Sequence, residues 1–436
     1  MDIRRRELIA GAAALLASPA VLPAEASLRR AARDACIFAS PQVEIANVRT
    51  RLLASGVPAG RFVSRPTLST PASRSVTTPN NDTLYAQAFI DLSKGPASLS
   101  LPALGGRYAS LALMDMYSNN FAVLGTRTTG DDAGEFQLVG PAHQGQADAI
   151  RSPTPWVWAL VRVLVDGPQD LDKAFAVTSG FVVKAAPSTT PAPGVARDAP
   201  WADYLKAVNA LLLENPALAT DRAALRRIAP LGLGLAGFDP ARFDAAAATE
   251  IAAGLAEARA FVRLPPAGTR MQGGWSSQPA DIGNFFQDYE TRARVALRLL
   301  AALPMAEAMY LGALSPEGRH LFDGDGTWQL SFPKDRLPPV DSFWSLTMYE
   351  ATPAGQFFLA PNAINRYAIG DRTPGLARNA DGSLDIWVSR ADPGGARSAN
   401  WLPAPGTGPF SMILRAYLPR PQLLSGAYLP PPFVKI

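Results

Sequence analysis

Two stretches of the sequence, on either side of a helical middle, contain similar short blocks in the same order. The block pairs are 99–102 with 330–333, 113–117 with 345–349, 121–127 with 367–372, and 159–164 with 412–417. One such match would mean little, because alternating strands draw on few residue types. Four matches in one order, which share a Pro, a Tyr and an Arg inside an apolar run, indicate a duplication. The sequence therefore predicts a mainly β protein with helical segments (α+β), in which two tandem jelly-roll or β-sandwich-like domains related by an internal repeat flank an α-helical insert.

Changes in residue pattern divide the chain into six parts. The predicted parts are a signal peptide at 1–26, a helical lead-in at 27–65, a first β domain at 66–183, a linker at 184–200, a helical segment at 201–320 and a second β domain at 321–436. The linker is dense in Pro, Ala and small polar residues. A length of 436 residues also favours more than one hydrophobic core.

Helical spacing of apolar residues marks the lead-in and the middle of the chain. In the lead-in Ile45, Val48 and Leu52 share one face, and Pro41 is expected to kink or split the helix. In the middle, the patterns predict three helices. The first has an apolar stripe from 201 to 212 and ends at 215–216. The second is Ala-rich, begins at 239–240 and runs to about 262, and the third runs from about 285 and stops near 304.

The N-terminus has the layout of an export signal. Arg4, Arg5 and Arg6 precede a modest apolar stretch, and 24–26 fits a small-x-small cleavage site. The run from Arg5 resembles a twin-arginine signal, although a general secretory signal is the alternative. We expect a periplasmic or secreted protein without a permanent membrane span after signal removal.

The composition argues against several classes of partner and cofactor. Lys and Arg exceed Asp and Glu by only 41 to 37, and they are scattered, so no nucleic-acid partner is expected. The single cysteine, Cys36, excludes an intramolecular disulfide, and a supply of only two histidines argues against a zinc site. No metal and no cofactor are predicted. Oligomeric state is left open.

Polar clusters at the ends of predicted strands provide the site candidates of the first half. One cluster immediately precedes a strand, and the other follows one; the candidates are Asn80, Asn81, Asp82, Thr83 and Tyr85, then Asp115, Tyr117 and Asn120. The plainer interpretation of both clusters is a structured turn, because Asn and Asp bond to nearby backbone. An inward-facing Asp115 would need a partner, for which Arg127 or Arg162 is available.

The second half offers aromatic and hydrogen-bonding residues on strands and loops. Its binding candidates are Trp344, Tyr349, Arg366, Tyr367, Asn400, Trp401 and Arg415. Core packing is the alternative role for the aromatic residues. His320 lies near Asp323 and Asp325, but no Gly-x-Ser-x-Gly motif accompanies it, which argues against a serine hydrolase triad.

The segments PNNDTLYAQAFIDLSKGP and LMDMYSNNFAVLGTR resemble domain of unknown function 1254, and DSFWSLTMYE, NRYAIGDR and NWLPAPGTGPFSMILRAYLP resemble domain of unknown function 1214. The two occur together in bacterial proteins, usually with an export signal. The resemblance implies tandem jelly-roll-like β domains with helical elements, and implies no particular reaction.

Three functions are compatible with these features. The first is an exported protein that binds a small polar, sugar-like or aromatic molecule in a cleft between the two β domains. The second is a metal-independent hydrolase or lyase that uses Asp82 or Asp115 as general acid or base, with Tyr117 as a further candidate. The third is a structural or interaction protein of the cell envelope. Convergence of the polar clusters on one pocket would favour the first two.

Overall fold

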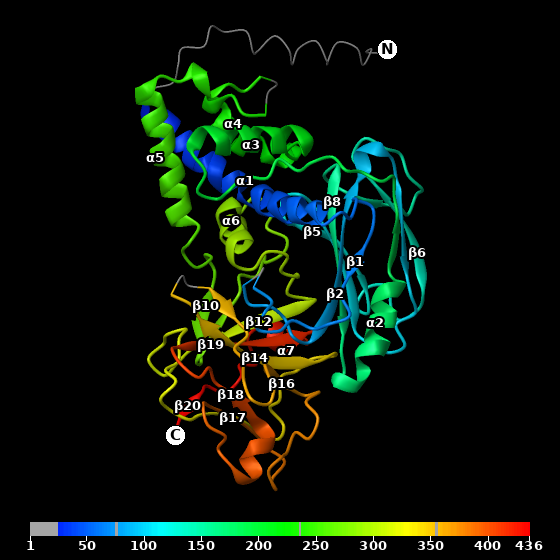
Figure 1. The fold of residues 1–436 in the computed structure, drawn as a ribbon, viewed down its shortest axis with the longest axis vertical. Helices are drawn as coiled ribbons and strands as arrows, with labels where there is room; N and C mark the ends of the chain where they lie inside the picture. The colour runs from blue at the N-terminus through cyan, green and yellow to red at the C-terminus, as the bar shows by residue number, and fades with distance from the viewer. Residues whose placement is uncertain (1–24, 75–76, 235–236, 354–355) are drawn as a thin grey trace.

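The computed structural model describes residues 25–74, 77–234, 237–353 and 356–436. It is a mixed α/β structure in which several β-sheets predominate, and Figure 1 shows helices at one end, an N-terminal β part beside them and a C-terminal β part at the other end. The predicted signal peptide falls almost entirely on residues 1–24, which lie outside the described residues.

The N-terminal β part contains two sheets that pack face to face. In the larger sheet the strand order is β1 (Val63–Ser64), β2 (Thr83–Asp91), β8 (Trp156–Leu164), β4 (Ala109–Met114), β5 (Asn120–Gly125). In the smaller sheet the order is β7 (Ile150–Arg151), β6 (Gly134–Val139), β3 (Ala97–Leu101), β9 (Val182–Lys184). Strand β8 is buried along its whole length because both faces of its sheet are covered. Alternate residues of the two sheets, such as Leu111, Val161 and Leu99, form the core between them.

The C-terminal β part also contains two sheets. In the larger sheet the strand order is β10 (Arg270–Gln272), β11 (Trp275–Ser277), β12 (Ala308–Ala313), β19 (Phe410–Tyr417), β14 (Trp344–Ala351), β15 (Phe357–Phe358), and β16 (Ala368–Gly370) also pairs with β14. In the smaller sheet the order is β18 (Trp401–Pro403), β17 (Leu384–Ser389), β13 (Trp328–Phe332), β20 (Val434–Lys435). Leu330, Leu346 and Leu414 contribute to the core between these sheets.

Corresponding strands take corresponding places in the two β parts. The order β2-β8-β4-β5 matches β12-β19-β14-β16, and β7-β6-β3-β9 matches β18-β17-β13-β20. The β6–β7 and β17–β18 pairs are both parallel, whereas the other pairs in these sheets are antiparallel. Three of the four block pairs, 99–102 with 330–333, 121–127 with 367–372 and 159–164 with 412–417, therefore lie on strands that hold the same positions in their sheets. The pair 113–117 with 345–349 is offset: 345–349 lie within β14, whereas 115–117 lie beyond the end of β4, and the residue that matches Ser345 is Ser110.

The helical part is built around α1 (Glu25–Ala54), which packs against α3 (Trp201–Glu214), α4 (Arg222–Ile228), α5 (Ala245–Phe261) and α6 (Tyr289–Arg298). Helices α1 and α5 cross closely because Gly254 has no Cβ; a Cβ there would overlap the carbonyl oxygen of Arg29. The predicted stripe of α3 is confirmed, since Tyr204, Leu205 and Val208 are among its buried residues.

Of the two effects predicted for Pro41, a kink or a split of the lead-in helix, the split does not occur. Helix α1 continues through Pro41, because a proline removes only one backbone N–H and buried residues on both sides, including Phe38 and Val43, hold the helix in the core. Asp239 also differs from the prediction: it caps a short 3₁₀ turn, and α5 begins only after a second cap at Asp244.

Strands begin earlier in the second half than the sequence suggested. Strands β10, β11 and β12 lie within 201–320, which was predicted to be helical. The sequence AMYLGA of β12 lacks β-branched residues and follows a helix closely, so its composition carries little strand signal. Two short helices complete the fold, α2 (Leu171–Gly180) against β2 and β8, and α7 (Pro421–Leu424) near the C-terminus.

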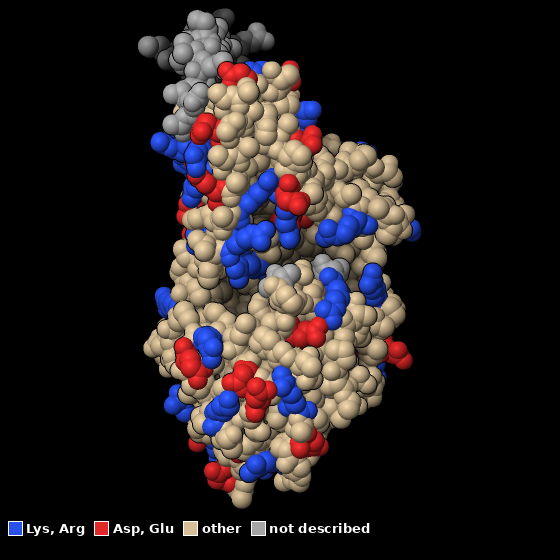
Figure 2. Space-filling view, turned by 60° about the vertical axis from the view of Figure 1, so that its left-hand side comes forward, with Lys and Arg blue, Asp and Glu red and all other residues tan. Residues whose placement is uncertain are grey.

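Figure 2 shows that one face of the molecule is hollowed across its middle, and that basic side chains gather along this hollow. Among the helices of the described residues, none is long and apolar enough to span a bilayer.

Candidate functional site

The outer faces of the two larger sheets meet at an interface that joins the β parts. Tyr108 and Leu164 from the N-terminal sheet pack there with Ala308, Phe343 and Tyr417 from the C-terminal sheet. The rings of Phe343 and Tyr417 stack with centroids 4.2 Å apart. Polar side chains lie within this apolar interface, and they form the candidate site.

Each sheet contributes one cross-strand row to the interface. By strand register, the N-terminal row is Tyr85, Arg162, Ser110 and Gly125, and the C-terminal row is Tyr310, Arg415, Ser345 and Gly370. The same residue types therefore occupy the same four strands in the same order.

The two arginines of these rows each bond to the opposite half of the chain. Arg162 Nη2 donates to the carbonyl oxygen of Ala301 at 2.8 Å, and Arg415 Nη2 donates to that of Thr78 at 3.0 Å. The acceptors precede β2 and β12, which carry the tyrosines of the two rows, and both have a positive φ, 64° at Ala301 and 51° at Thr78. The arrangement is thus reciprocal.

Both arginines are almost fully buried, with 5% of Arg162 and 4% of Arg415 exposed. Within the described part of the chain neither guanidinium has a carboxylate within ion-pair distance. Arg415 also donates Nη1 to Thr347 Oγ1, whereas the buried Nη1 of Arg162 has no hydrogen-bond partner among the described residues. Burying a cation with an unsatisfied hydrogen-bond donor costs folding free energy unless another group accepts the hydrogen bond and balances the charge.

A carboxylate lies three residues before the tyrosine of each row, at Asp82 and at Glu307. Glu307 is closed off: its side chain is 1% exposed and accepts bonds from Tyr108 Oη at 2.8 Å and Arg127 Nε at 2.6 Å. Asp82 is partly exposed and accepts only one side-chain bond that the structure shows, from Ser345 Oγ at 2.6 Å.

The difference between these carboxylates has an identifiable cause. The position of Tyr108, two residues before the row serine, is taken by Phe343, which has no hydroxyl. The position of Arg127, two residues after the row glycine, is taken by Arg372, which instead pairs with Asp166 at 3.3 Å. We call each of these carboxylates, together with the side chains around it, a half-site. The Glu307 half-site is therefore completed by the protein's own side chains, and the Asp82 half-site is left open.

Two carboxyl groups at the open half-site, those of Asp82 and Asp371, have pKa values raised above the usual one. Burial raises the pKa of the Asp82 carboxyl, against the opposing effects of the Arg415 charge and the Ser345 hydrogen bond. Burial likewise raises the pKa of Asp371 to about 6, and the Asp82 charge adds to this shift, while the Trp344 N–H and Arg372 oppose it. The tyrosines that face the site, Tyr310 and Tyr417, have pKa values raised by burial, so they remain hydroxyl donors.

Asp371→Asn is expected to flatten the dependence of stability on pH. The pKa of Asp371 is about 6 in the folded chain against a usual 3.8, so the folded state binds the extra proton and stability falls as pH rises through this window. Urea unfolding between pH 4 and pH 7 would measure the slope, with Asp148→Asn at an exposed position as the control. An unchanged slope in Asp371→Asn would contradict the assignment.

The polar cluster predicted before a strand, at residues 80–85, lies at this interface. Asn80 donates to Tyr417 Oη at 2.6 Å and accepts from the backbone N–H of Asp82, which fixes the turn before β2. Tyr349 donates its hydroxyl to the carbonyl of Pro79. Asn81 bonds to the Ser69 carbonyl, and Thr83 is buried beside it. Asp82, Tyr85 and Arg415 are thus brought together with Arg162.

The polar cluster predicted after a strand, at residues 115–120, forms a turn at the other end of the sheet. Asp115 accepts bonds from the backbone of Tyr117 and Asn119 and from the Asn119 side chain. Asp82 bonds through its backbone to Val165, whereas Met114 pairs with Trp158, so Asp82 and Asp115 lie roughly 20 Å apart along the sheet.

The cation near Asp115 is not one of the two that the sequence suggested. Arg162 and Arg127 bond to Ala301 and Glu307, and Arg292 of α6 supplies the positive charge that lowers the Asp115 pKa against the larger effect of burial. The long sequence separation hid this contact. Around the same turn, Tyr117 Oη bonds to the Asn215 carbonyl and Asn120 Nδ2 to the carbonyls of Gly283 and Ala302, so these side chains tie segments together.

The predicted residues of the C-terminal loops bond mainly to backbone. Arg366 donates to the carbonyls of Ala399 and Trp401, and Asn400 bonds to Ala377 and Asp385. Tyr367 Oη donates to Asn365 Oδ1, Trp401 Nε1 bonds to the Ser389 carbonyl, and Trp344 belongs to the core of the C-terminal β part. These contacts lie away from the interface residues, so the three clusters do not form one pocket.

Several site residues were missed as candidates, namely Tyr108, Ser110, Arg162, Glu307, Tyr310, Ser345 and Tyr417. A sequence signal for some of them exists: the pattern Pro-x-x-Asp/Glu-x-x-Tyr at 79–85 recurs at 304–310. The residues that the structure describes contain no group of three or more His, Cys, Asp or Glu side chains placed to hold a metal ion.

Comparisons with known proteins agree with the two-part organisation. Residues 59–185 match the family described as "Protein of unknown function (DUF1254)", and 307–421 match "Protein of unknown function (DUF1214)". No curated protein gives a significant match.

Two solved structures resemble the chain. The crystal structure of the VPA0106 protein from Vibrio parahaemolyticus is 22% identical with a TM-score of 0.69, and the match covers 94% of this chain and 100% of that one, so the fold is shared. A putative uncharacterized protein from Burkholderia cenocepacia is 15% identical with a TM-score of 0.46 over 94% of each chain. The two family matches between them span more than half of the sequence, in the expected order, so the chain belongs to the proteins in which a DUF1254 domain is followed by a DUF1214 domain.

Proposed function

We propose that the protein binds a small carboxylate-bearing molecule between the outer faces of its two larger sheets. The observation that carries this proposal is the buried Arg162 guanidinium, whose Nη1 lacks a partner among the described residues and whose charge lacks a neighbouring carboxylate. An anion at Nη1 would satisfy both the donor and the charge.

The neighbouring side chains suit a ligand with a polar and an aromatic or sugar-like part. The ring of Tyr85 lies 5.5 Å from the Arg162 guanidinium carbon, and Tyr85 and Tyr310 both keep part of their surface exposed. Asp82 has an oxygen available to accept a ligand hydroxyl, at the place where Arg127 and Tyr108 close the equivalent Glu307.

This site also gives a reason for the duplicated architecture. We propose that the two β parts descend from one jelly-roll or β-sandwich-like domain, with the helices added as an insert, on the grounds of the matching strand orders and cross-strand rows. One copy of the half-site is then sealed by its own ion pair, and the other keeps a functional carboxylate. Export by a twin-arginine-like signal to the periplasm or the medium stands as part of the same proposal.

A second candidate function is acid–base catalysis by Asp82. Burial raises the pKa of its carboxyl, and the side chain accepts one hydrogen bond that the structure shows, so it has an oxygen left to exchange a proton with a ligand. Asp115, which is occupied by bonds from its own turn, offers less support for this role.

A thermal-shift series with the full chain tests the proposal. The probes are benzoate, 4-hydroxybenzoate, lactate and inorganic phosphate, each from micromolar to millimolar concentration. A carboxylate that binds should stabilise the fold by about 2.7 kcal/mol at a hundredfold excess over its Kd. Arg162→Met should remove this response, and Arg420→Met, at an exposed ion pair with Asp341, should keep it.

A second variant at the same position keeps the test decisive. Arg162→Lys retains a buried charge and should keep part of the response if the fold of Arg162→Met is disturbed. Saturation by no probe, or an equal response in Arg162→Met that remains folded, would reject the proposal.

A further inference from the structure

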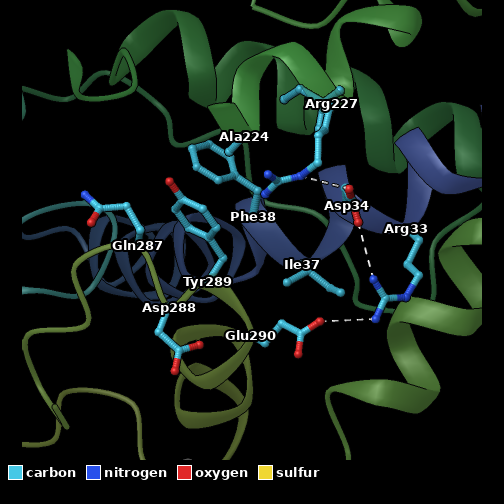
Figure 3. Close-up of a pocket in the computed structure, with 11 residues that line it drawn as sticks. Arg33, Asp34, Ile37, Phe38, Ala224, Arg227, Gln287, Asp288, Tyr289 and Glu290 are labelled. Atoms are coloured by element: carbon cyan, nitrogen blue, oxygen red, sulfur yellow. Dashed lines mark hydrogen bonds and ion pairs between the residues drawn. The ribbon is translucent and has the colours of Figure 1, made fainter. Parts of the chain in front are cut away.

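A separate cavity lies in the helical part, away from the interface of the sheets. It has a volume of about 360 Å³, is open to solvent on one side, and is lined by α1, α4, the start of α6 and the turn that leads into α6. Figure 3 shows its lining residues: an apolar group at the base and charged side chains around it. A volume of this size falls within the range of pockets that hold small molecules.

The base of the cavity is apolar and held in place. Ile37, Phe38 and Ile228 are buried, and the Tyr289 ring packs on Phe38 with centroids 5.3 Å apart. Tyr289 Oη donates to Asp221 at 2.9 Å, and burial raises its pKa to about 12, so the hydroxyl stays protonated and the ring stays oriented. A hydrocarbon or aromatic group can therefore bury its surface here.

Charged side chains of alternating sign form one wall. Arg227 pairs with Asp34 at 3.1 Å, Asp34 with Arg33 at 3.3 Å, and Arg33 with Glu290 at 3.3 Å. This network links α1, α4 and α6. Both Arg227 and Glu290 are half exposed at the two ends of the network, so each can bind a further group of opposite charge.

The remaining wall adds a carboxylate. Asp288 uses Oδ1 to cap α6 through the Thr291 N–H, and the residue is otherwise exposed. The cavity thus presents two arginines and three carboxylates around an apolar base. A lone anion or a lone cation would meet unfavourable charges on one side, whereas a molecule that carries both charges would meet favourable ones on each.

We propose that this cavity binds a zwitterionic amphipathic molecule of amino-acid type, with its carboxylate at Arg227, its ammonium group at Glu290 and Asp288, and its apolar side chain over Ile37, Phe38 and Ile228. The site is independent of the one proposed between the sheets. Nothing in its binding requires Arg162 or Asp82.

Three matched probes test this assignment by calorimetry on the full chain: L-phenylalanine, 3-phenylpropionate, which lacks the amine, and phenethylamine, which lacks the carboxylate. L-Leucine and L-methionine vary the apolar group. At least one amino acid should bind saturably, and each single-charge analogue of L-phenylalanine should bind at least about tenfold more weakly, as expected for the loss of one charge-assisted contact.

Variants locate the binding. Arg227→Ala should weaken amino-acid binding about tenfold, and Arg226→Ala, the neighbouring exposed arginine of α4 that does not line the cavity, should change it less than about twofold. Arg227→Gln, which keeps most of the side chain, gives the same comparison if the alanine variant melts early. Arg162→Met should leave this binding unchanged, which separates the two sites.

The proposal is overturned if none of the amino acids binds, if 3-phenylpropionate or phenethylamine binds as tightly as L-phenylalanine, or if binding survives in a folded Arg227→Ala protein.

Discussion

Truncating Glu307 to alanine is expected to lower the free energy of unfolding by about 3 kcal/mol, whereas the same truncation of Asp82 costs about 1 kcal/mol or less. The two carboxylates hold equivalent positions before β2 and β12. Glu307 is buried, and its loss leaves the Tyr108 hydroxyl without its carboxylate acceptor and Arg127 without its counter-charge. Asp82 is partly exposed, and its loss removes one hydrogen bond from Ser345.

Urea unfolding at pH 7 measures both effects. Glu307→Gln, which retains an acceptor for Tyr108, should recover a large part of the loss and so separates the hydrogen bonds from packing. Equal losses in Glu307→Ala and Asp82→Ala would show that the two half-sites are not closed and open as described. The small effect at Asp82 also has a practical value, because a folded Asp82→Ala protein can be tested for ligand binding.

The matching sequence blocks made part of this site accessible from the sequence. The block pair 159–164 and 412–417 contains Arg162 and Arg415 at the same offset, and the strands that carry them hold the same place in their sheets. Asn80, Asp82 and Tyr85 were candidates because polar residues before a strand often form a turn or a binding edge. Local pattern was sufficient for those positions, and for the apolar stripe of α3.

The partners of these residues could not be predicted in the same way. The contact from Ser345 to Asp82 joins residues 263 positions apart, and the one from Arg127 to Glu307 joins residues 180 apart. Such contacts depend on how two separately folded sheets pack, and periodicity describes only the face that each strand presents. Asp115 shows the opposite case: its bonds are to its own turn, as the plainer interpretation of its cluster required.

Composition also concealed the strand that carries half of the site. Strand β12 places Tyr310 beside Arg415, yet its sequence is rich in Ala, Met and Leu, which are good helix formers. Its strand conformation comes from hydrogen bonds to β11 and β19 on either side, so it is fixed by tertiary structure.

Gly370→Ala is expected to lower the free energy of unfolding by about 3 kcal/mol. Gly370 ends the C-terminal row, opposite Ser345, and a Cβ at this position would overlap the carbonyl oxygen of Trp344 in the neighbouring strand. Gly125 holds the equivalent place opposite Ser110, where a Cβ would overlap the Ala109 carbonyl. Because the obstacle is backbone in both halves, a side chain could be accommodated only by separating β16 from β14, or β5 from β4.

Gly406→Ala is the matched control, since a Cβ there would meet no atom within 4 Å and the residue lies in an exposed loop. Its stability should change by no more than about 0.5 kcal/mol. Chemical unfolding of the two variants beside the parent chain decides the matter, and a Gly370→Ala protein as stable as Gly406→Ala would mean that the rows are not packed as closely as the register implies. A large loss at Gly370 would instead show that β16 must approach β14 this closely beside Ser345, which lies next to Arg415 in the C-terminal row and donates its hydroxyl to Asp82.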